Sequence, residues 1–420
     1  MTKKLYYFTL RFFFTSLVLL VKIVKPLVLV RFGFYRCFRI GSMVGDLDVT
    51  LTKKKVDHSL PNRILDVYIP EAPKKNSANS LLTKLWRRSG VFILAYSKWS
   101  DKFLRELNIK ALTDSKLAPH LIHGVRSPKD RVLDDRDLHN ITENFPPNIW
   151  LKSLEYNNGN RWLESLDIEP DAKVALLLGR DTEYGRTRKD VPEYHMHRNC
   201  DINRFDLAAK YLVEQGYYVF RMGSLVKTPF EIADENRIFD YAVNGMRTEF
   251  RDIFLANRCT FVISVSSGYD ALPTAFRKPK VIVNYPCIGT APLHYRNSII
   301  LCKVIKDTFT HETLTIDDLF QRGVLFEFDK RSFDRANCFF VDNSSLEIQK
   351  TVTEAEEKLI KKSSDTDIED KFQFMFRQNL KKFYANAPSD IKCEINARYS
   401  QYGLQEGHFK LSQNMVSEAD

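Results

Sequence analysis

Apolar residues in the second half of the chain come in short runs that polar, helix-forming segments separate. Val174 to Leu178 is a five-residue apolar run with polar flanks, which is typical of a buried parallel strand. The same pattern predicts further strands and intervening helices; the strands are 217–222, 238–241, 261–265 and 280–284, and the helices are 204–214, 249–257 and 268–276. This alternation predicts a doubly wound parallel sheet, whose ligands bind at the carboxyl ends of the strands.

The first half of the chain shows an α/β pattern that is less regular. An apolar strand over 28–40 is expected to lead into a glycine loop, Gly41 to Gly45, and then into a helix with Asp46 at its head. Strands are also expected over 64–69 and 91–95, with a short helix over 81–88 and with loops and short helices over 112–148 that line a cleft. We therefore expect an α/β fold in which two domains face a cleft.

The pattern divides the 420 residues into four expected parts. They are a membrane-associated anchor over 1–35, a first α/β domain over 36–165, a second over 166–345, and a helical tail over 346–420. The tail holds a charged helix over 346–360, a Ser/Asp/Lys linker and a second helix over 372–383.

The net charge of +10 suggests a nucleic-acid binder until its distribution is considered. Residues 1–40 contain eight basic residues and no acidic one, so the remaining residues carry about +2. Because the body of the protein is nearly neutral, we expect no nucleic-acid partner. Binding of DNA by a chain lacking the basic segment, with a steep salt dependence, would revive that alternative.

The basic N-terminal residues accompany a long apolar run, LYYFTLRFFFTSLVLLV from Leu5 to Val21. A signal peptide is disfavoured because no small-x-small cleavage site follows Val21. A transmembrane helix is open, although the run is short and Arg11 lies near its middle. We favour an aromatic-rich basic anchor in the membrane surface, with Lys22, Lys25 and Arg31 at anionic head groups and the body on the cytoplasmic face.

The seven cysteines are widely spaced, odd in number and form no CxxC pair. This spacing argues against a zinc module or a disulfide framework and favours a reducing compartment. We expect most of them to be small core residues.

Three loops that follow predicted strands of the second half are suited to binding an anion. They contain Gly179-Arg180-Asp181, Arg221 with Gly223-Ser224, and Ser266-Ser267-Gly268. In a parallel sheet these loops converge on one edge, where two guanidinium groups and a hydroxyl-rich loop can hold a diphosphate. The alternatives are that Arg180 and Arg221 form ion pairs with Asp181 or Asp240, and that the serine loop is only a helix cap.

Two further clusters are candidates for chemistry. His195-Met196-His197-Arg198 precedes a helix, and Arg198 with one histidine could reach the cleft; two histidines without a third ligand predict no zinc site. Asp46-Leu47-Asp48 matches the DxD pattern of some metal-dependent sugar transferases, but the pattern is short. We prefer a general-base role for Asp46, with helix capping as the alternative, and we expect no metal and no cofactor.

No dinucleotide-binding, Walker A, zinc-protease, serine-hydrolase or kinase signature occurs in the sequence. Hydride transfer, ATP hydrolysis and a serine triad therefore have no support.

Several stretches resemble a family of bacterial glycosyltransferases of the GT-B type, which is associated with surface polysaccharide synthesis. The resemblance covers about residues 36–345, and its most specific part runs from Tyr211 to Gly268. The matching stretches are Arg39-Ile40-Gly41, ANSLLTKLWRR, Gly179-Arg180-Asp181, His197-Arg198-Asn199, EQGYYVFRMGS, Asp240-Tyr241-Ala242, FRDIFLANRCTFVISVSSG and Arg277-Lys278-Pro279.

The chain also resembles fucosyltransferases more loosely, with Arg180 in the place of their diphosphate-binding arginine. The glycine loop with Asp46 is similar to the start of heptosyltransferases, where an aspartate at the helix head is the base. One difference is Ser42, because the bacterial family often has histidine at this position. The resemblance implies two Rossmann-like domains, the first for the acceptor and the second for the nucleotide-sugar donor.

We therefore predict a glycosyltransferase that moves a sugar from a nucleotide-sugar to a glycan or lipid-linked acceptor at the membrane surface, for surface polysaccharide synthesis. The alternative is a non-catalytic membrane-surface protein of the same fold that binds a glycan or a partner. The reaction is expected to be metal-independent, and the resemblance implies inversion at the anomeric carbon. The predicted site residues are Asp46 as base, Arg180, Arg198, Arg221, Ser266, Ser267 and Gly268 for the donor, and Gly41, Ser42 and Gly45 in the acceptor-side loop.

Overall fold

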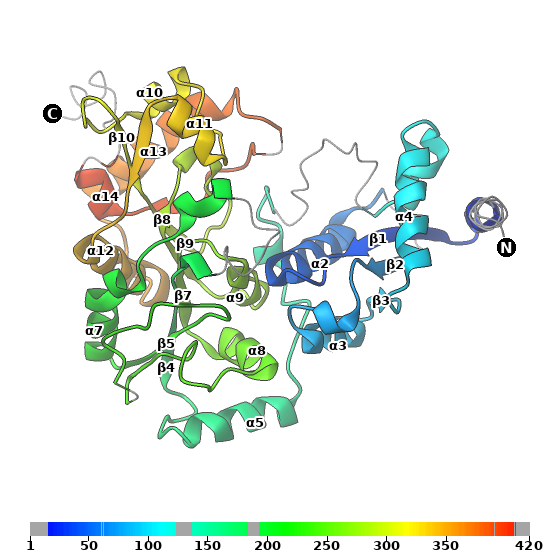
Figure 1. The fold of residues 1–420 in the computed structure, drawn as a ribbon, viewed down its shortest axis with the longest axis horizontal. Coiled ribbons are helices and arrows are strands. Elements are labelled where there is room, and N and C mark those ends of the chain that lie inside the picture. Colours follow the sequence, from blue (N-terminus) through cyan, green and yellow to red (C-terminus); the bar gives the residue numbers. More distant parts are fainter. Residues whose placement is uncertain are drawn as a thin grey trace. The chain divides into compact units, whose positions relative to one another are not determined.

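The computed structural model describes most of the chain and separates it into two compact units. Unit 1 comprises Met1–Arg136 and Pro147–Trp150, and unit 2 comprises Asp137–Pro146 and Leu151–Asp420. Figure 1 labels the elements of both units. The described residues are 16–59, 61, 63–122, 137–183, 193–234, 236–389, 391–406 and 408.

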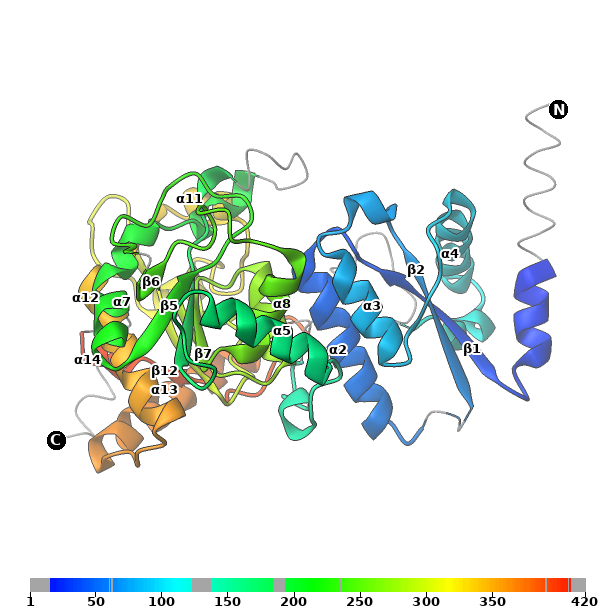
Figure 2. The same cartoon turned by 90° about the horizontal axis from the view of Figure 1, so that it is seen from below.

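Unit 1 contains a parallel three-stranded sheet in the order β1-β2-β3. Figure 2 shows α2 and α3 on one side of this sheet and α4 on the other. The strands are β1 (Leu29–Tyr35), β2 (Ile64–Pro70) and β3 (Phe92–Ile93). The helices are α2 (Ile40–Val56), α3 (Ser80–Arg88) and α4 (Lys98–Ala111), with short 3₁₀ turns η1 (Lys74–Asn76) and η2 (Ser115–His120).

The expected strand over 28–40 ends earlier than predicted. β1 stops at Tyr35, and α2 begins at Ile40, so the expected glycine loop is the first part of a helix. The physical reason is that Met43, Val44 and Leu47 recur at helical spacing and are all buried, so the apolar contacts of α2 outweigh the low helix propensity of its glycines.

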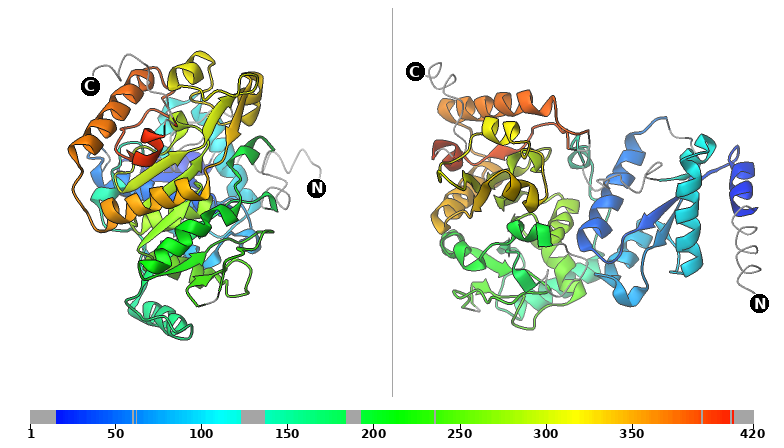
Figure 3. Two further views of the ribbon diagram at one scale, coloured as in Figure 1. Left: turned by 90° about the vertical axis from the view of Figure 1, so that its left-hand side faces the viewer. Right: turned by 45° about the horizontal axis from the view of Figure 1, so that its top comes forward.

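The expected anchor over 1–35 is in part an element of unit 1. Residues 29–35 form β1, and residues 16–24 form a helix whose Val21 joins the apolar core with Phe103 and Leu104 of α4. Figure 3 shows this dark-blue helix beside α4. In the part of the chain that the structure describes, no helix has both the length and the apolar character needed to cross a membrane.

Unit 2 is built on a seven-stranded sheet in which every paired neighbour is parallel, in the order β12-β9-β8-β7-β4-β5-β6. A separate antiparallel pair joins β10 and β11. The strands are β4 (Lys173–Leu178), β5 (Tyr217–Arg221), β6 (Ile238–Phe239), β7 (Phe261–Ser264), β8 (Lys280–Tyr285), β9 (Ser298–Cys302), β10 (Val304–Asp307), β11 (Cys338–Val341) and β12 (Arg398–Tyr399).

Helices cover both faces of this sheet, which confirms the predicted α/β class. Ala175 and Leu177 of β4 pack with residues of α7 and α12, whereas Val174, Leu176 and Leu178 pack with residues of α5 and α8 (Figure 1). The helices are α5 (Ser153–Glu164), α7 (Asp206–Glu214), α8 (Glu249–Arg258), α9 (Ala271–Ala275), α10 (Ile316–Gln321), α11 (Lys330–Arg335), α12 (Ser345–Ala355), α13 (Asp367–Tyr384) and α14 (Gln401–Gln405). The shorter turns are η3 (Thr142–Asn144), η4 (Glu193–Arg198), η5 (Ile202–Phe205), η6 (Gly268–Asp270), η7 (Ile288–Thr290) and the π-helical turn η8 (Glu356–Ile360).

The expected tail over 346–420 is an integral part of unit 2. Ile348 and Val352 of α12 belong to its main core, and β12 pairs with β9 at the edge of the sheet. The expected border near residue 165 also differs, because α5 packs against unit 2 through Leu163. Six of the seven cysteines are buried, as predicted for small core residues.

Candidate functional site

The loops after β4 and β7 lie at the point where the connections of the seven-stranded sheet change direction. β4 has β5 on one side and β7 on the other, so successive crossovers leave this point toward opposite edges. Ligands of open parallel sheets bind at such a switch point, outside the carboxyl ends of the strands. The parallel pairing of β4 with β7 confirms that Gly179-Arg180-Asp181 and Ser266-Ser267-Gly268 lie at the same edge.

The segment 196–200 ties these two loops together. One guanidinium nitrogen of Arg198, Nη2, donates a hydrogen bond to the carbonyl oxygen of Ser266 at 2.5 Å. The backbone N–H of Cys200 donates to the carbonyl of Arg180 at 2.9 Å. Arg198 therefore contacts the loop after β7, and Arg180 is partly exposed at the end of β4.

The loop after β7 has an unusual backbone and a buried carboxyl group beneath it. Ser266 has a φ of 60°, in the left-handed region, and Ser267 caps η6 by accepting a hydrogen bond from Tyr269 N–H at 3.3 Å. The serine loop thus includes the helix cap that the sequence left open as an alternative. Ser264 Oγ donates to the carboxylate of Asp270 at 2.5 Å.

Burial of Asp270 raises its pKa to about 6, although Ser264 and the nearby cations Lys280 and Arg198 act in the opposite direction. Burial likewise lowers the pKa of Lys280 to about 7. The carboxyl group of Asp270, buried beneath the loop after β7, therefore changes its charge at mildly acidic pH.

Arg221 does not lie on the exposed edge, which corrects its expected contact with the donor. It is fully buried, and its guanidinium group donates to Asp240 Oδ1 and to the carbonyl of Thr228, both at 3.0 Å. Asp240 also accepts a hydrogen bond from Phe230 N–H at 2.8 Å. The structure thus has the Arg221–Asp240 ion pair that the sequence left open as the alternative.

The chain after β5 contacts Arg221 through the carbonyl of Thr228 and contacts Asp181 through its backbone N–H groups. One carboxylate oxygen of Asp181 accepts hydrogen bonds from Lys227 N–H at 2.5 Å and Thr228 N–H at 3.3 Å. Asp181 therefore links the loop after β4 to the loop after β5.

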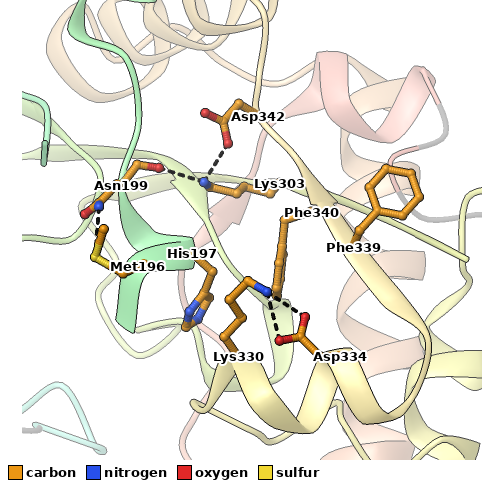
Figure 4. Close-up of a pocket in the computed structure, with 9 residues that line it drawn as sticks. All are labelled: Met196, His197, Asn199, Lys303, Lys330, Asp334, Phe339, Phe340 and Asp342. Carbon is orange, nitrogen blue, oxygen red and sulfur yellow. Dashed lines mark hydrogen bonds and ion pairs between the residues drawn. The ribbon is translucent and has the colours of Figure 1, made fainter. Parts of the chain in front are cut away.

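A pocket of about 310 Å³ adjoins the same segment 196–200 (Figure 4). Lys303 lies at the end of β9, and its ammonium group donates to Asp342 at 2.6 Å and to the carbonyl of Asn199 at 2.9 Å. His197 stacks on Phe340, with ring centroids 5.1 Å apart. The pocket is lined by Met196, His197, Asn199, Lys303, Lys330, Asp334, Phe339, Phe340 and Asp342.

The sequence interpretation missed Lys303 and its partners. The apolar run from Ser298 to Cys302 carried the signal, because recognising it as a strand would have placed Lys303 at its carboxyl end. Phe340 lies within the antiparallel strand β11 and Asp342 directly follows it, and no local pattern connects them with the segment 196–200.

In unit 1 the predicted base is placed differently from the expectation. Asp46 lies in the second turn of α2 instead of at its head, is buried, and forms an ion pair with Arg36 at 2.7 Å. Gly41, Ser42 and Gly45 precede it within the same helix. The expected position is wrong because α2 starts at Ile40, before the glycines.

The two carboxylates of the DxD pattern have separate surroundings. Asp48 accepts a hydrogen bond from Asn148 Nδ2 at 2.8 Å, whereas Asp46 pairs with Arg36. Among the described residues, no three His, Cys, Asp or Glu side chains are grouped so that they could hold a metal ion.

No protein-family model matches the chain, and no curated protein matches it. Similar solved structures include the ADP-heptose LPS heptosyltransferase II of E. coli, at 13% identity over 66% of this chain and 91% of that chain, with a TM-score of 0.36. They also include a glycosyl transferase family 9 protein of Veillonella parvula, at 14% identity over 79% of this chain and 97% of that chain, with a TM-score of 0.43. A UDP-GlcNAc 2-epimerase of Neisseria meningitidis has 12% identity over 79% of this chain and 99% of that chain, with a TM-score of 0.32.

The two transferases are of the kinds that the sequence resembles. All three TM-scores lie below 0.5.

Proposed function

We propose that this protein is a glycosyltransferase that moves a sugar from a nucleotide-sugar donor to a hydroxyl group of a glycan or lipid-linked acceptor. The observation that carries the proposal is the pair of polar loops at the switch point of the unit 2 sheet, which the segment 196–200 joins through Arg198 and Cys200. Guanidinium and backbone N–H groups at such an edge are suited to a diphosphate.

The donor diphosphate is proposed to contact Arg180, Arg198 and the loop from Ser266 to Gly268. In the transfer step negative charge develops on the departing nucleoside diphosphate, and fixed cationic donors stabilise it. Arg221 is left out of this set because Asp240 and Thr228 already hold its guanidinium group in the interior.

Unit 1 is proposed to hold the acceptor, as the resemblance to GT-B enzymes implies. The residues of the expected acceptor-side loop, Gly41, Ser42 and Gly45, belong to the first turns of α2. Charge neutralisation by arginine instead of a metal, and inversion at the anomeric carbon, are further parts of the proposal. Nuclear magnetic resonance of the product's anomeric configuration tests inversion, and transfer in the presence of EDTA tests metal independence.

We also propose that the helix over 16–24 attaches the protein to a membrane surface, on the cytoplasmic side. Leu19, Leu20 and Ile23 are each more than half exposed, while Val21 packs into unit 1 and Lys22 forms an ion pair with Asp114 at 2.8 Å. An apolar face beside basic residues is suited to the interface of an anionic bilayer.

Sedimentation with phosphatidylglycerol vesicles tests this attachment. The full chain should sediment with the vesicles, and replacing Leu19, Leu20 and Ile23 together by Ser should weaken its binding. Leu154→Ser is the matched control, because this leucine of unit 2 is 67% exposed and lies outside the proposed face. Equal sedimentation of all three proteins would contradict the attachment.

A donor screen with the full-length protein tests the transferase activity. Thermal shifts are measured with GDP-, UDP-, CMP- and ADP-sugars, and each donor that binds is followed for release of its nucleotide and for product. We expect one nucleotide class to raise the melting temperature and to support transfer. Binding without turnover would favour a non-catalytic glycan- or partner-binding protein, and an absence of binding would refute the donor site.

A further inference from the structure

Glu71 lies at the carboxyl edge of the unit 1 sheet. It directly follows Pro70, the last residue of β2, and its backbone N–H donates to the carbonyl of Tyr35 at the end of β1, at 3.2 Å. In the parallel register Tyr35 is opposite Pro70, so Glu71 is fixed beside the start of the β1–α2 connection. This is the edge of a parallel sheet at which ligands bind.

One oxygen of the Glu71 carboxyl group has no hydrogen-bond partner among the residues that the structure describes. Oε2 is buried and makes no hydrogen bond to the described residues, although the side chain as a whole is partly exposed. A buried acceptor that stays unsatisfied costs about 1–3 kcal/mol, and a hydroxyl group of a ligand would remove that cost. The position therefore indicates a carboxyl group that receives a hydrogen bond from a bound molecule.

Asp46, the expected base, is less available for this role. Its carboxylate forms an ion pair with Arg36 at 2.7 Å, and its side chain is only 5% exposed. A carboxylate that a guanidinium group holds at this distance is a weaker proton acceptor than one without such a partner.

The pKa of Glu71 lies above its ordinary value. Burial raises the pKa, and the neighbouring arginines lower it only in part. A raised pKa brings a carboxylate closer to the range in which a general base works efficiently near neutral pH. The charged and titratable groups that act on it from the β1–α2 connection and from α4 are Arg36, Cys37, Arg39, Asp101 and Arg105.

We propose that Glu71 is the general base that removes the proton from the acceptor hydroxyl; this inference rests on the transferase activity proposed above. The hydroxyl proton passes to the Glu71 carboxylate while the hydroxyl oxygen forms its bond to the anomeric carbon of the donor. The bond between that carbon and the phosphate oxygen breaks, and its electron pair leaves with the nucleoside diphosphate. Water then takes the proton from Glu71 and restores the carboxylate.

Glu71→Gln tests the proposal in the full-length protein with the donor that the thermal-shift screen identifies. A general base contributes about 10²- to 10⁴-fold, and we expect a loss of kcat in this range. The thermal shift caused by the matching nucleoside diphosphate should stay unchanged, because the proposed diphosphate contacts lie in unit 2.

The pH profile separates a base from a structural residue. The wild-type rate should rise as pH increases through the pKa of Glu71, because only the carboxylate accepts a proton. Glu71→Gln should lack this rise. Glu71→Asp should keep the rise with pH but transfer at an intermediate rate, because it retains a carboxylate on a side chain that is one methylene group shorter.

Asp57→Asn is the matched control, because it makes the same acid-to-amide change at the exposed end of α2. It should transfer at the wild-type rate. A Glu71→Gln protein that transfers within threefold of wild type, or keeps the same pH profile, would overturn the role of Glu71 and leave the transferase intact. A wild-type protein that neither binds nor turns over any of the four donor classes would overturn both.

Discussion

Two neighbouring strands of the unit 2 sheet, β4 and β5, are each associated with an arginine at the carboxyl end, and the two arginines have different surroundings. Arg180 follows β4 and is partly exposed. Arg221 ends β5, is fully buried, and is paired with Asp240. The chain after β5 folds over the strand end, and the hydrogen bonds from Lys227 and Thr228 to Asp181 hold it there.

The contrast indicates that an arginine at a strand end can reach a ligand where the sheet topology leaves that end open. β4 lies at the switch point next to β7, so the connections on its two sides lead away from each other. β5 lies outside this point, and its own connection covers its end. Arginine at a carboxyl end is therefore accessible for the proposed donor contact in one case and forms an interior ion pair in the other.

Arg221→Ala should give the largest effect on stability. It leaves Asp240 in the interior without its charge partner, and breaking a buried pair from one side costs about 3–5 kcal/mol. Urea unfolding of the variant measures this loss. The double change Arg221→Met with Asp240→Leu should recover most of it, because no unpaired charge remains. A fully stable Arg221→Ala protein that fails to bind nucleotide would make Arg221 a donor contact after all.

Arg180→Ala should reduce transfer while leaving the fold intact. Removing one fixed donor to developing charge costs about 10²- to 10³-fold in rate, whereas surface substitutions change stability by about 0.5 kcal/mol or less. Steady-state kinetics with the identified donor and urea unfolding measure the two quantities. The donor assignment would be wrong if the purified variant transferred at nearly the wild-type rate.

Asp270 should make the stability of unit 2 depend on pH. Its pKa is raised from 3.8 to about 6 by burial, so between these values the folded state binds more protons than the unfolded state. The free energy of unfolding should therefore fall as pH rises from about 4 to about 6, by up to roughly 3 kcal/mol at about 1.4 kcal/mol per pKa unit.

Unfolding at a series of pH values checks this slope, and Asp270→Asn should flatten it. Asp252→Asn is the matched comparison, because burial also raises the pKa of Asp252 to about 6. Asp252→Asn should also reduce the pH dependence of the free energy of unfolding between about pH 4 and 6, and it should leave diphosphate binding unchanged. An unchanged slope in Asp270→Asn would contradict the assignment.

Arg198→Ala should give the smallest of these effects. It removes one hydrogen bond from a charged donor to the loop after β7, and such bonds contribute about 1.5–3 kcal/mol. Calorimetry should show nucleoside diphosphate binding that is roughly ten- to hundredfold weaker. Arg204→Ala is the control, because Arg204 also donates to a backbone carbonyl, that of Asn343 at 3.2 Å, away from the two loops. Equal affinities of both variants would remove Arg198 from the site.

The predicted strands of the second half correspond to β4, β5, β6, β7 and β8 in the structure. These strands could be predicted from the sequence because helices cover both faces of the sheet, so each strand is a nearly continuous apolar run. The edge strand β12 has only two residues, Arg398 and Tyr399, and pairs with a strand about a hundred positions earlier. So short a strand has no periodic pattern, and only its partner β9 makes it part of the sheet.

The candidate site was predictable in its residue types and only in part in its geometry. The Gly-Arg-Asp and Ser-Ser-Gly loops were expected at one sheet edge, and β4 and β7 do bring them there. The position of Asp46 was not predictable, because the start of α2 depends on the burial of Met43, Val44 and Leu47. Glu71 gave no local signal, since its proximity to the end of β1 arises from pairing between strands.

The α/β class, the order of the main strands and helices from β4 to β8, and the loops that have arginine, serine or glycine after an apolar strand follow from the sequence alone. Local periodicity and local turn residues are enough for these conclusions. The interior position of Arg221, the ion pair of Asp46 and the place of the described residues after 345 in unit 2 arise from three-dimensional contacts. The physical reason is that burial and charge pairing depend on contacts between distant segments, which no local pattern specifies.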